Sequence, residues 1–225
     1  MSSHNTSATQ REEWTRSDKY FENLLIPKDN VLEATRTKTT EASIRDMAVS
    51  PAQGKFLHLL ARSINAKRIV EVGTLGAYST IWLARALPED GKLMTFELSE
   101  LHAEVARKNL EAAGLSSKAT VVVGPAIDGL KRLQPSFDLA FIDADKQSNL
   151  EYFIEAKRLV RSGGVIIVDN VVRRGQVADL SITEGRVEGV RRLINALQND
   201  SEVDCTVMGT AGCKGYDGFL YAIRN

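Results

Sequence analysis

Two apolar segments of this 225-residue chain end abruptly in oxygen-bearing side chains. FDLAFIDADK closes on Asp143 and Lys146, and GGVIIVDN closes on Asp169 and Asn170. If the two segments are neighbouring parallel strands, three oxygen ligands and one lysine meet at one edge of the sheet. Carboxylate and amide oxygens suit Mg²⁺, Mn²⁺ or Ca²⁺ better than zinc or copper. Asp and Asn also end strands simply because they favour turns, but two such ends favour a metal-assisted site.

The elements that must position these residues alternate along the chain. Apolar runs with strand character are separated by amphipathic helical patterns, including one helix over 149–164, and Val/Ile runs such as VIIVD indicate strands buried on both faces. This βαβ order predicts an α/β fold with a doubly wound sheet. We expect strands at 68–73, 92–98, 119–124, 137–143, 165–170, 204–210 and 218–224.

The two ends of the chain depart from this alternation. Only AGCKGYD separates the last two strands, and a parallel crossover needs about a dozen residues, so this pair is predicted to be antiparallel. Residues 13–50 are predicted to form a helical cap, broken at Pro27 and Pro51. We expect a disordered tail over 1–12, followed by a single domain over 13–225.

Bulk composition excludes several classes of protein. Lys+Arg and Asp+Glu balance at 29 each, which favours neither a nucleic-acid nor a membrane-surface partner. Cys205 and Cys213 form no C-x-x-C pair, which favours a reducing, cytoplasmic setting. No apolar run approaches the roughly 18 residues of a membrane span. The first ten residues lack the apolar stretch of a secretory signal, and a mitochondrial presequence is a weaker alternative because they contain no arginine.

A glycine-containing turn follows the first strand in Glu71-Val-Gly73-Thr-Leu-Gly76. Its spacing is G-x-x-G, which differs from the G-x-G-x-x-G of dinucleotide sites. The glycines allow the backbone to pass close to a ligand at the carboxyl edge of the sheet. Glu97 ends the second strand, where a carboxylate can accept both hydroxyls of a ribose. The alternative for Glu97 is a charge beside the helix start at Ser99.

These motifs together resemble one known family. EVGTLGAYST, FELSE, VVVGPAIDGL, IDADK and VDN, in this order, are similar to the cation-dependent O-methyltransferases, which include catechol and caffeoyl-coenzyme A O-methyltransferases. The resemblance covers roughly residues 40–225, and the two acidic strand ends are its most specific part. It implies a Rossmann-like, seven-stranded, mostly parallel sheet with a reversed C-terminal strand, helices on both faces, and a homodimer.

The resemblance also implies roles for individual residues. Lys146 would be the catalytic base, and Asp143, Asp169 and Asn170 would bind the metal. Glu97 would hold the ribose of S-adenosylmethionine. The whole predicted cofactor site comprises Met47, Val49, Glu71, Gly73, Ser79, Glu97, Ala126 and Asp143.

The implied reaction moves a methyl group from a sulfonium to an oxygen of a catechol-type phenol. The acceptor must be an oxyanion, because a neutral phenol with a pKa of about 10 is a poor nucleophile. A divalent cation lowers the pKa of a bound hydroxyl, a neutral Lys146 would take the proton, and alignment would supply much of the rate.

Two segments depart from the family pattern. Lys146 is followed by Gln147-Ser148-Asn149, where many members have an Asn-Tyr pair after one residue. The loop 171–185 lacks a tryptophan common there and carries Arg173 and Arg174. This loop is expected to wall the acceptor pocket. Its arginines either meet an acidic substrate or form a solvated charge pair.

Three other functions compete with this one. A nicotinamide dehydrogenase shares the sheet and the ribose acid, but it has another glycine spacing and no use for the acidic strand ends. A hydrolase lacks support because no G-x-S-x-G is present and the histidines fall on the tail and on helices. A non-catalytic S-adenosylmethionine-binding protein remains the third possibility, disfavoured because Lys146 and the three oxygen ligands are all intact.

Overall fold

The computed structural model describes residues 3–225, and its centre is a seven-stranded sheet in the order β3-β2-β1-β4-β5-β7-β6. β7 pairs antiparallel with both β5 and β6, whereas the four pairings among β1 to β5 are parallel. The predicted α/β fold with a reversed final strand is therefore confirmed. The strands are β1 (Arg68–Val72), β2 (Lys92–Glu97), β3 (Ala119–Val123), β4 (Phe137–Ile142), β5 (Val160–Asp169), β6 (Val203–Gly212) and β7 (Gly215–Arg224).

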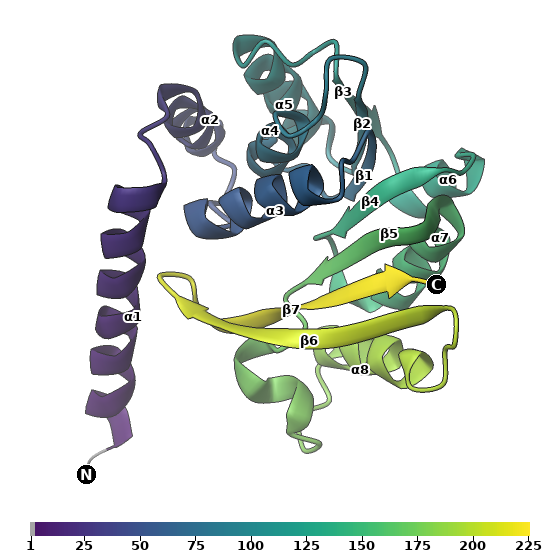
Figure 1. Cartoon of the computed structure of the whole chain (residues 1–225). Helices are drawn as coiled ribbons and strands as arrows, with labels where there is room; N and C mark the ends of the chain where they lie inside the picture. The colour runs from purple at the N-terminus through teal and green to yellow at the C-terminus, as the bar shows by residue number, and fades with distance from the viewer. Residues whose placement is uncertain (1–2) are drawn as a thin grey trace.

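Helices cover both faces of the sheet (Figure 1), because successive strand residues point to opposite sides. On β1, Ile69 packs into one apolar cluster with α3, α4 and α5, while Val70 packs into a second cluster with α6, α7 and α8. The first layer comprises α3 (Pro51–Ser63), α4 (Tyr78–Ala84) and α5 (Glu100–Ala112), and the second comprises α6 (Ala126–Arg132), α7 (Asn149–Leu159) and α8 (Gly185–Leu197).

The fifth strand begins earlier than its sequence suggests. We expected a helix to continue to residue 164, but α7 ends at Leu159 and β5 begins at Val160. Val160 is buried and pairs with Phe137 of β4, and Arg161 forms an ion pair of 2.7 Å with Asp138. These contacts come from a strand that is distant in sequence, so the local helical pattern could not reveal them.

The N-terminal segment is helical, as expected, but it differs from the prediction at its start. Helix α1 (Ser3–Leu25) includes most of the segment that was expected to be a disordered tail, and residues 1–2 lie outside the described part. α1 extends away from the sheet, beside the turn that joins β6 and β7 (Figure 1). Asp18 anchors it there by accepting a hydrogen bond of 2.6 Å from the backbone N–H of Cys213. Helix α2 (Asn30–Glu41) then leads back to α3.

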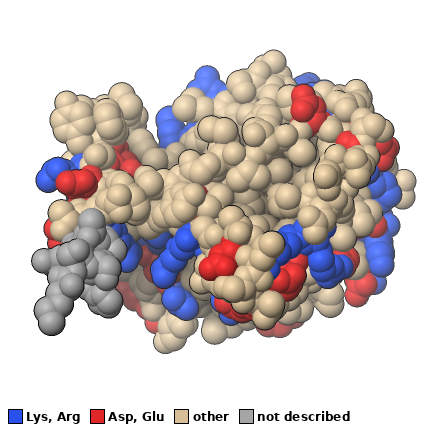
Figure 2. Space-filling view, turned by 90° about the horizontal axis from the view of Figure 1, so that it is seen from below, with Lys and Arg blue, Asp and Glu red and all other residues tan. Residues whose placement is uncertain are grey.

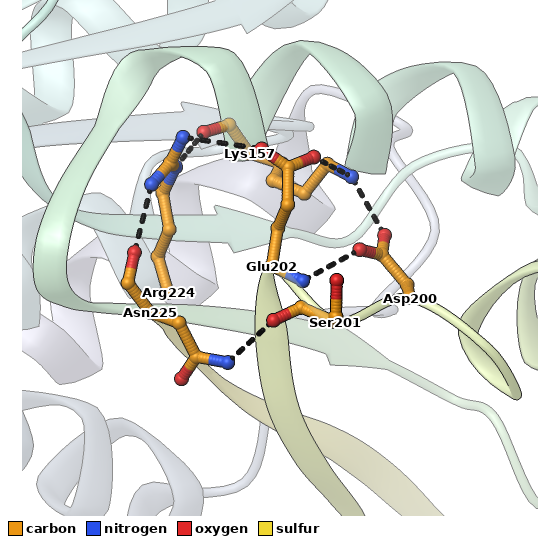
Figure 3. Close-up of polar contacts among 6 residues, drawn as sticks. All are labelled: Lys157, Asp200, Ser201, Glu202, Arg224 and Asn225. Carbon is orange, nitrogen blue, oxygen red and sulfur yellow. Dashed lines mark hydrogen bonds and ion pairs between the residues drawn. The ribbon is translucent and has the colours of Figure 1, made fainter.

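The C-terminal strand is fastened by a cluster of ion pairs and hydrogen bonds (Figure 3). Lys157 of α7 lies 2.6 Å from Asp200 and 2.7 Å from Glu202, both in the turn before β6. Arg224 donates to the carbonyl of Lys157 at 2.7 Å, and Asn225 donates its backbone N–H to Glu202 at 2.8 Å. These contacts join α7, the α8–β6 turn and the end of β7.

Charges of both signs are interspersed on the face of the molecule drawn in Figure 2, in keeping with the zero net charge. Among the described helices, none combines the length and the apolar character needed to cross a membrane.

Candidate active site

The glycine turn after β1 brings the end of β1 close to the end of β4. Gly73 has φ +98°, and a methyl group there would overlap the carbonyl oxygen of Asp143. Gly76 faces α2, where an added methyl group would overlap the hydroxyl of Thr39. Its carbonyl accepts a hydrogen bond of 3.0 Å from the side chain of Asn109 in α5. Only glycine fits these two positions, and the turn is held between the sheet, the cap and α5.

Glu71 is completely buried beneath this turn. Its two carboxyl oxygens accept hydrogen bonds from Ser79 at 2.6 Å and from Thr80 at 2.5 Å, both in the first turn of α4. Burial raises the pKa of Glu71 to about 7, against the hydrogen bonds that lower it. The carboxyl group thus fixes the start of α4 behind the turn.

Glu97 organises the same turn from β2. Its Oε2 accepts hydrogen bonds from the backbone N–H groups of Thr74 at 3.3 Å and Leu75 at 2.9 Å, and its Oε1 accepts one from Ser99 N–H at 3.0 Å. His102 Nδ1 lies 3.3 Å from Oε1. The alternative of a charge beside the helix start is therefore partly right, but the carboxylate also binds the glycine turn, and it lines a cleft.

The two acidic strand ends are close enough to influence each other. Lys146 Nζ lies 2.9 Å from Asp143 Oδ1, and the lysine is buried. Asp169 is buried too, and its pKa is raised first by burial and then by the charge of Asp143, with Lys146 opposing the shift. Asn170 follows with φ 58°, and its backbone N–H donates to Asp169 at 2.8 Å. Two carboxyl groups therefore share one lysine as their nearby cation.

A single cleft of about 810 Å³ joins the glycine turn to these acidic residues. It opens at the carboxyl edge of the sheet where β1 lies between β2 and β4, the switch point at which such sheets bind ligands. Two predicted site residues, Glu71 and Asp169, do not line it and are buried behind it. The predicted residues that do line the cleft are Met47, Val49, Gly73, Ser79, Glu97, Ala126, Asp143, Lys146 and Asn170.

The segment between α2 and α3 closes one side of this cleft. Met47 is 56% exposed and Val49 is 5% exposed, yet both contribute to the lining. Ala126, which also lines the cleft, begins α6 directly after Pro125. The cap predicted beside the sheet thus contributes directly to the cleft.

Sequence reasoning missed several residues of the cleft. The sequence predicted only that the histidines fall on the tail and on helices, whereas His102 lines the cleft beside Glu97. Tyr152 donates a hydrogen bond of 2.6 Å to Asp145. Burial alone would raise the pKa of Asp145, but hydrogen bonds from Ser148 and from Tyr152 lower it. The position of His102 in the first turn after the acidic strand end was the available signal. Nothing local marks Tyr152.

The donor set is compatible with a divalent cation. Two carboxyl groups and a neighbouring amide supply the oxygen ligands that Mg²⁺ and Ca²⁺ take. The pKa of Asp169 is raised first by burial and then by the charge of Asp143, and a bound cation would offset both effects. Among residues 3–225, no cluster of three or more His, Cys, Asp or Glu forms a metal site. A site here would therefore need the Asn170 amide or non-protein ligands beside the two carboxylates.

Comparison with known proteins agrees with this geometry. A family model described as O-methyltransferase matches residues 23–215. The chain belongs to the O-methyltransferase family. It is 47% identical over 210 residues to a catechol O-methyltransferase of Niastella koreensis, covering 92% of this chain and 95% of that protein.

Two solved O-methyltransferases have the same architecture as this family member. One from Bacillus cereus, in complex with SAH, has a TM-score of 0.93 and 46% identity and covers 95% of this chain and 99% of its own. One from Streptomyces achromogenes, in complex with SAM, has a TM-score of 0.92 and 44% identity and covers 96% and 99%. The protein is an S-adenosylmethionine-dependent O-methyltransferase, and the competing dehydrogenase and non-catalytic interpretations are set aside.

Proposed function

We propose that this enzyme methylates a hydroxyl group of a catechol-type small molecule and that it needs a divalent cation. The single observation that carries the proposal is the continuity of the cleft: the glycine turn, Glu97 and Ala126 lie along the same cavity as Asp143, Lys146 and Asn170. A donor bound at the glycine turn would therefore face an acceptor held at the acidic strand ends. The relative from Niastella koreensis that is named a catechol O-methyltransferase supports the choice of acceptor.

Seven of the eight predicted cofactor residues line the cleft, and Glu71 alone lies behind it. Glu97, Ala126, Gly73 and Ser79 line the cleft and would contact S-adenosylmethionine directly. Glu71 lies behind Ser79, so we propose that it acts by holding that serine and the start of α4. Met47 and Val49 would cover the cofactor from the cap side.

Asp143, Asp169 and Asn170 would hold the cation. When bound, a divalent cation lowers the pKa of a phenol hydroxyl that it contacts, so that the acceptor is ionised near neutral pH. The chain's own contribution is Lys146, whose Nζ is held 2.9 Å from Asp143 and buried at the cleft. We propose that Lys146, in its neutral form, accepts the proton from the phenol oxygen that is to be methylated; in the structure its amine donates to Asp143. Its buried side chain and its contact with Asp143 restrict where the amine can lie, which favours transfer along a defined direction.

Metal dependence is tested by following methyl transfer to catechol before and after exhaustive chelation, and again after Mg²⁺ is added back. Loss of turnover on chelation and its recovery with Mg²⁺ are expected. Full turnover in the chelated enzyme would remove the metal from the proposal. Resorcinol, whose hydroxyls are not adjacent, should be a much poorer acceptor because it cannot chelate a cation through both oxygens.

The role of Lys146 is tested separately from cofactor binding. Lys146→Ala should keep its affinity for S-adenosylmethionine, measured by calorimetry, and lose about 10²–10⁴-fold in kcat, the usual size of a general-base contribution. Lys108→Ala is the matched control, because Lys108 lies on the surface of α5, paired with Glu104 at 2.7 Å. Undiminished methylation by Lys146→Ala would remove the assigned role.

We also propose that the enzyme is a homodimer associating through α1. Four large apolar side chains of α1 are 58–69% exposed, namely Tyr20, Phe21, Leu24 and Leu25. An exposed patch of this kind on a helix that extends from the body favours burial against a partner. Light scattering of the purified chain should give twice the mass of 24.7 kDa, and Leu24→Asp should shift it toward one copy. A monomeric wild-type protein at micromolar concentration would contradict this.

A further inference from the structure

The acceptor end of the cleft contains an arginine that no family motif accounted for. Arg173 begins the 3₁₀ segment η2 (Arg173–Ala178), four residues after Asp169, and lines the same cleft as Asp143, Lys146 and Asn170. Its neighbour Arg174 is exposed and does not line the cleft. Two adjacent arginines, which the sequence could not tell apart, therefore occupy different environments.

Within the described part of the chain, the guanidinium group of Arg173 has no carboxylate within ion-pair distance, although the Asp217 carboxylate accepts a hydrogen bond from the Arg173 backbone N–H. The Arg173 side chain forms no ion pair there, and its Nε is buried without a hydrogen-bond partner. Arg191, also half-buried and next to the same loop, donates to Glu188 and to four backbone carbonyl contacts. A buried N–H group without an acceptor is unfavourable, so the guanidinium group has unused hydrogen-bonding capacity that a ligand at the cleft could engage.

The backbone at Arg173 is held in place. Its N–H donates to Asp217 Oδ1 at 2.8 Å, the same oxygen that accepts from Val172 at 3.3 Å and from Gly218 at 2.9 Å. Arg173 has φ 49°, a left-handed conformation that non-glycine residues adopt only when their surroundings impose it. Val171, two residues earlier, is buried and hydrogen-bonded to Gly218. The arginine is thus presented to the cleft from a fixed backbone.

Other charged groups of the cleft already have partners. Asp143 is paired with Lys146, and Asp145 accepts from Tyr152. Arg186, the other arginine that lines the cleft, has the carboxylate of Glu184 at 3.7 Å. Of the two arginines that line the cleft, Arg173 is therefore the one without an ion pair among the described residues.

We propose that Arg173 binds a carboxylate group carried by the acceptor, so that the preferred substrate is a catechol acid and not a neutral catechol. The guanidinium group offers parallel N–H donors that match the two oxygens of a carboxylate. The proposal rests on the proposed function, because it places the catechol oxygens at Asp143 and Lys146 and the acid at Arg173. It assigns the loop 171–185 a role in substrate selection.

The test compares an acid with a neutral compound of the same shape. We would measure kcat/KM for 3,4-dihydroxybenzoate and 3,4-dihydroxybenzamide with Mg²⁺ and S-adenosylmethionine, for wild type, Arg173→Met and Arg174→Met. Wild type should prefer the acid by about tenfold or more, since a charge-assisted pair is stronger than a neutral one. Arg173→Met should lower this acid/amide ratio by about tenfold, mainly through KM for the acid. Methionine preserves length and bears the same left-handed backbone.

Arg174→Met is the matched control, since it removes the same charge one residue away from an exposed side chain. It should keep the wild-type acid/amide ratio, and Arg173→Lys should retain only part of it. Turnover of the amide by Arg173→Met shows that this variant is folded. If Arg173→Met turns over neither compound, its S-adenosylmethionine affinity shows whether it is folded, and Arg173→Lys carries the test. An affinity equal to that of wild type, together with an unchanged acid/amide ratio in Arg173→Lys, would overturn the proposal.

The outcomes separate this inference from the proposed function. If wild type methylates both compounds equally, or if Arg173→Met keeps the wild-type ratio, the carboxylate subsite is wrong and catechol methylation stands. A ratio lost equally in Arg174→Met would reduce the effect to general surface charge and would also refute the subsite. If wild type methylates neither compound nor catechol itself, the proposed function fails and the subsite fails with it.

Discussion

Gly189 of α8 allows the helix to lie directly against the turn that carries Lys146. A methyl group at this position would overlap the carbonyl oxygen of Lys146 and lie 2.7 Å from the Cα of Gln147. Both neighbours are backbone atoms, so neither can rotate away. Gly189→Ala therefore requires the helix and the turn η1 (Lys146–Ser148) to separate. We predict that this substitution impairs catalysis more than folding.

The size of the effect can be worked from the geometry. Ordinary van der Waals contact begins near 3.4 Å, so the Cα of Gln147 must move by at least about 0.7 Å, and the carbonyl of Lys146 by more. Overpacking of this kind costs about 1–3 kcal/mol, while replacing glycine by alanine within a helix returns about 1 kcal/mol. The net loss of stability is then about 0–2 kcal/mol. A misplacement of about 1 Å at a reacting group costs about 10²-fold in rate.

The assay combines thermal unfolding with single-turnover methyl transfer at saturating S-adenosylmethionine. Gly189→Ala should lower Tm by no more than about 8 °C and lower kcat by about 10–10²-fold, with cofactor affinity unchanged. Gly185→Ala is the matched control on the same helix, because a methyl group there would lie 3.6 Å from the side-chain nitrogen of Gln147. It should keep the wild-type rate and raise Tm slightly. A Gly189→Ala enzyme with wild-type kcat and Tm would refute the close packing of α8 on Lys146.

Three further predictions concern buried or partly buried charges. The folded pKa of about 7 for Glu71 lies above its ordinary 4.5, so the stability of the wild-type protein falls as pH rises from 4.5 to 7. In urea unfolding, the free energy of unfolding of Glu71→Gln should therefore rise by about 3 kcal/mol relative to wild type across that range, and a pH-independent difference would contradict this. Glu97→Ala removes the acceptor of the Leu75 N–H and should weaken S-adenosylmethionine binding, measured by calorimetry, about tenfold or more. An unchanged affinity would mean that the Glu97 carboxylate has no role in the cofactor site. Lys157→Met should destabilise the fold by about 1–2 kcal/mol near neutral pH, because the hydrogen bond from Lys157 lowers the pKa of Asp200. This loss of stability should shrink as pH falls below 3.8, and a loss that persists in acid would indicate that Lys157 acts through packing and not through charge.

The sequence alone determined the elements of the sheet and the direction of its last strands. Strand and helix periodicities are local properties, and the seven residues between the last two predicted strands, 204–210 and 218–224, were too few for a parallel crossover, so the antiparallel pair could be predicted. The acidic ends of β4 and β5 and the G-x-x-G turn were readable for the same reason. Each is a short segment at a strand end, and its residue types alone indicate a ligand-binding edge of the sheet.

Contacts between distant segments were decided only by the tertiary structure. The residues near Gly76 in sequence do not predict its contacts with Thr39 and Asn109. Likewise, the residues near Lys146 do not predict that Gly189 packs against the Lys146 backbone. The strand start at Val160 likewise depended on a partner in β4.

Arg173 and Arg174 show most clearly which features the sequence determines and which only the tertiary structure decides. In the sequence Arg173 and Arg174 are equivalent charges, because composition and spacing say nothing of which side chain a loop turns inward. Hydrogen bonds from the loop to Asp217, more than forty residues later, place Arg173 at the cleft and leave Arg174 in solvent. The residue types set which chemistry is available, and long-range packing decides which of them faces the ligand, because a side chain's burial depends on segments that its own neighbours do not specify.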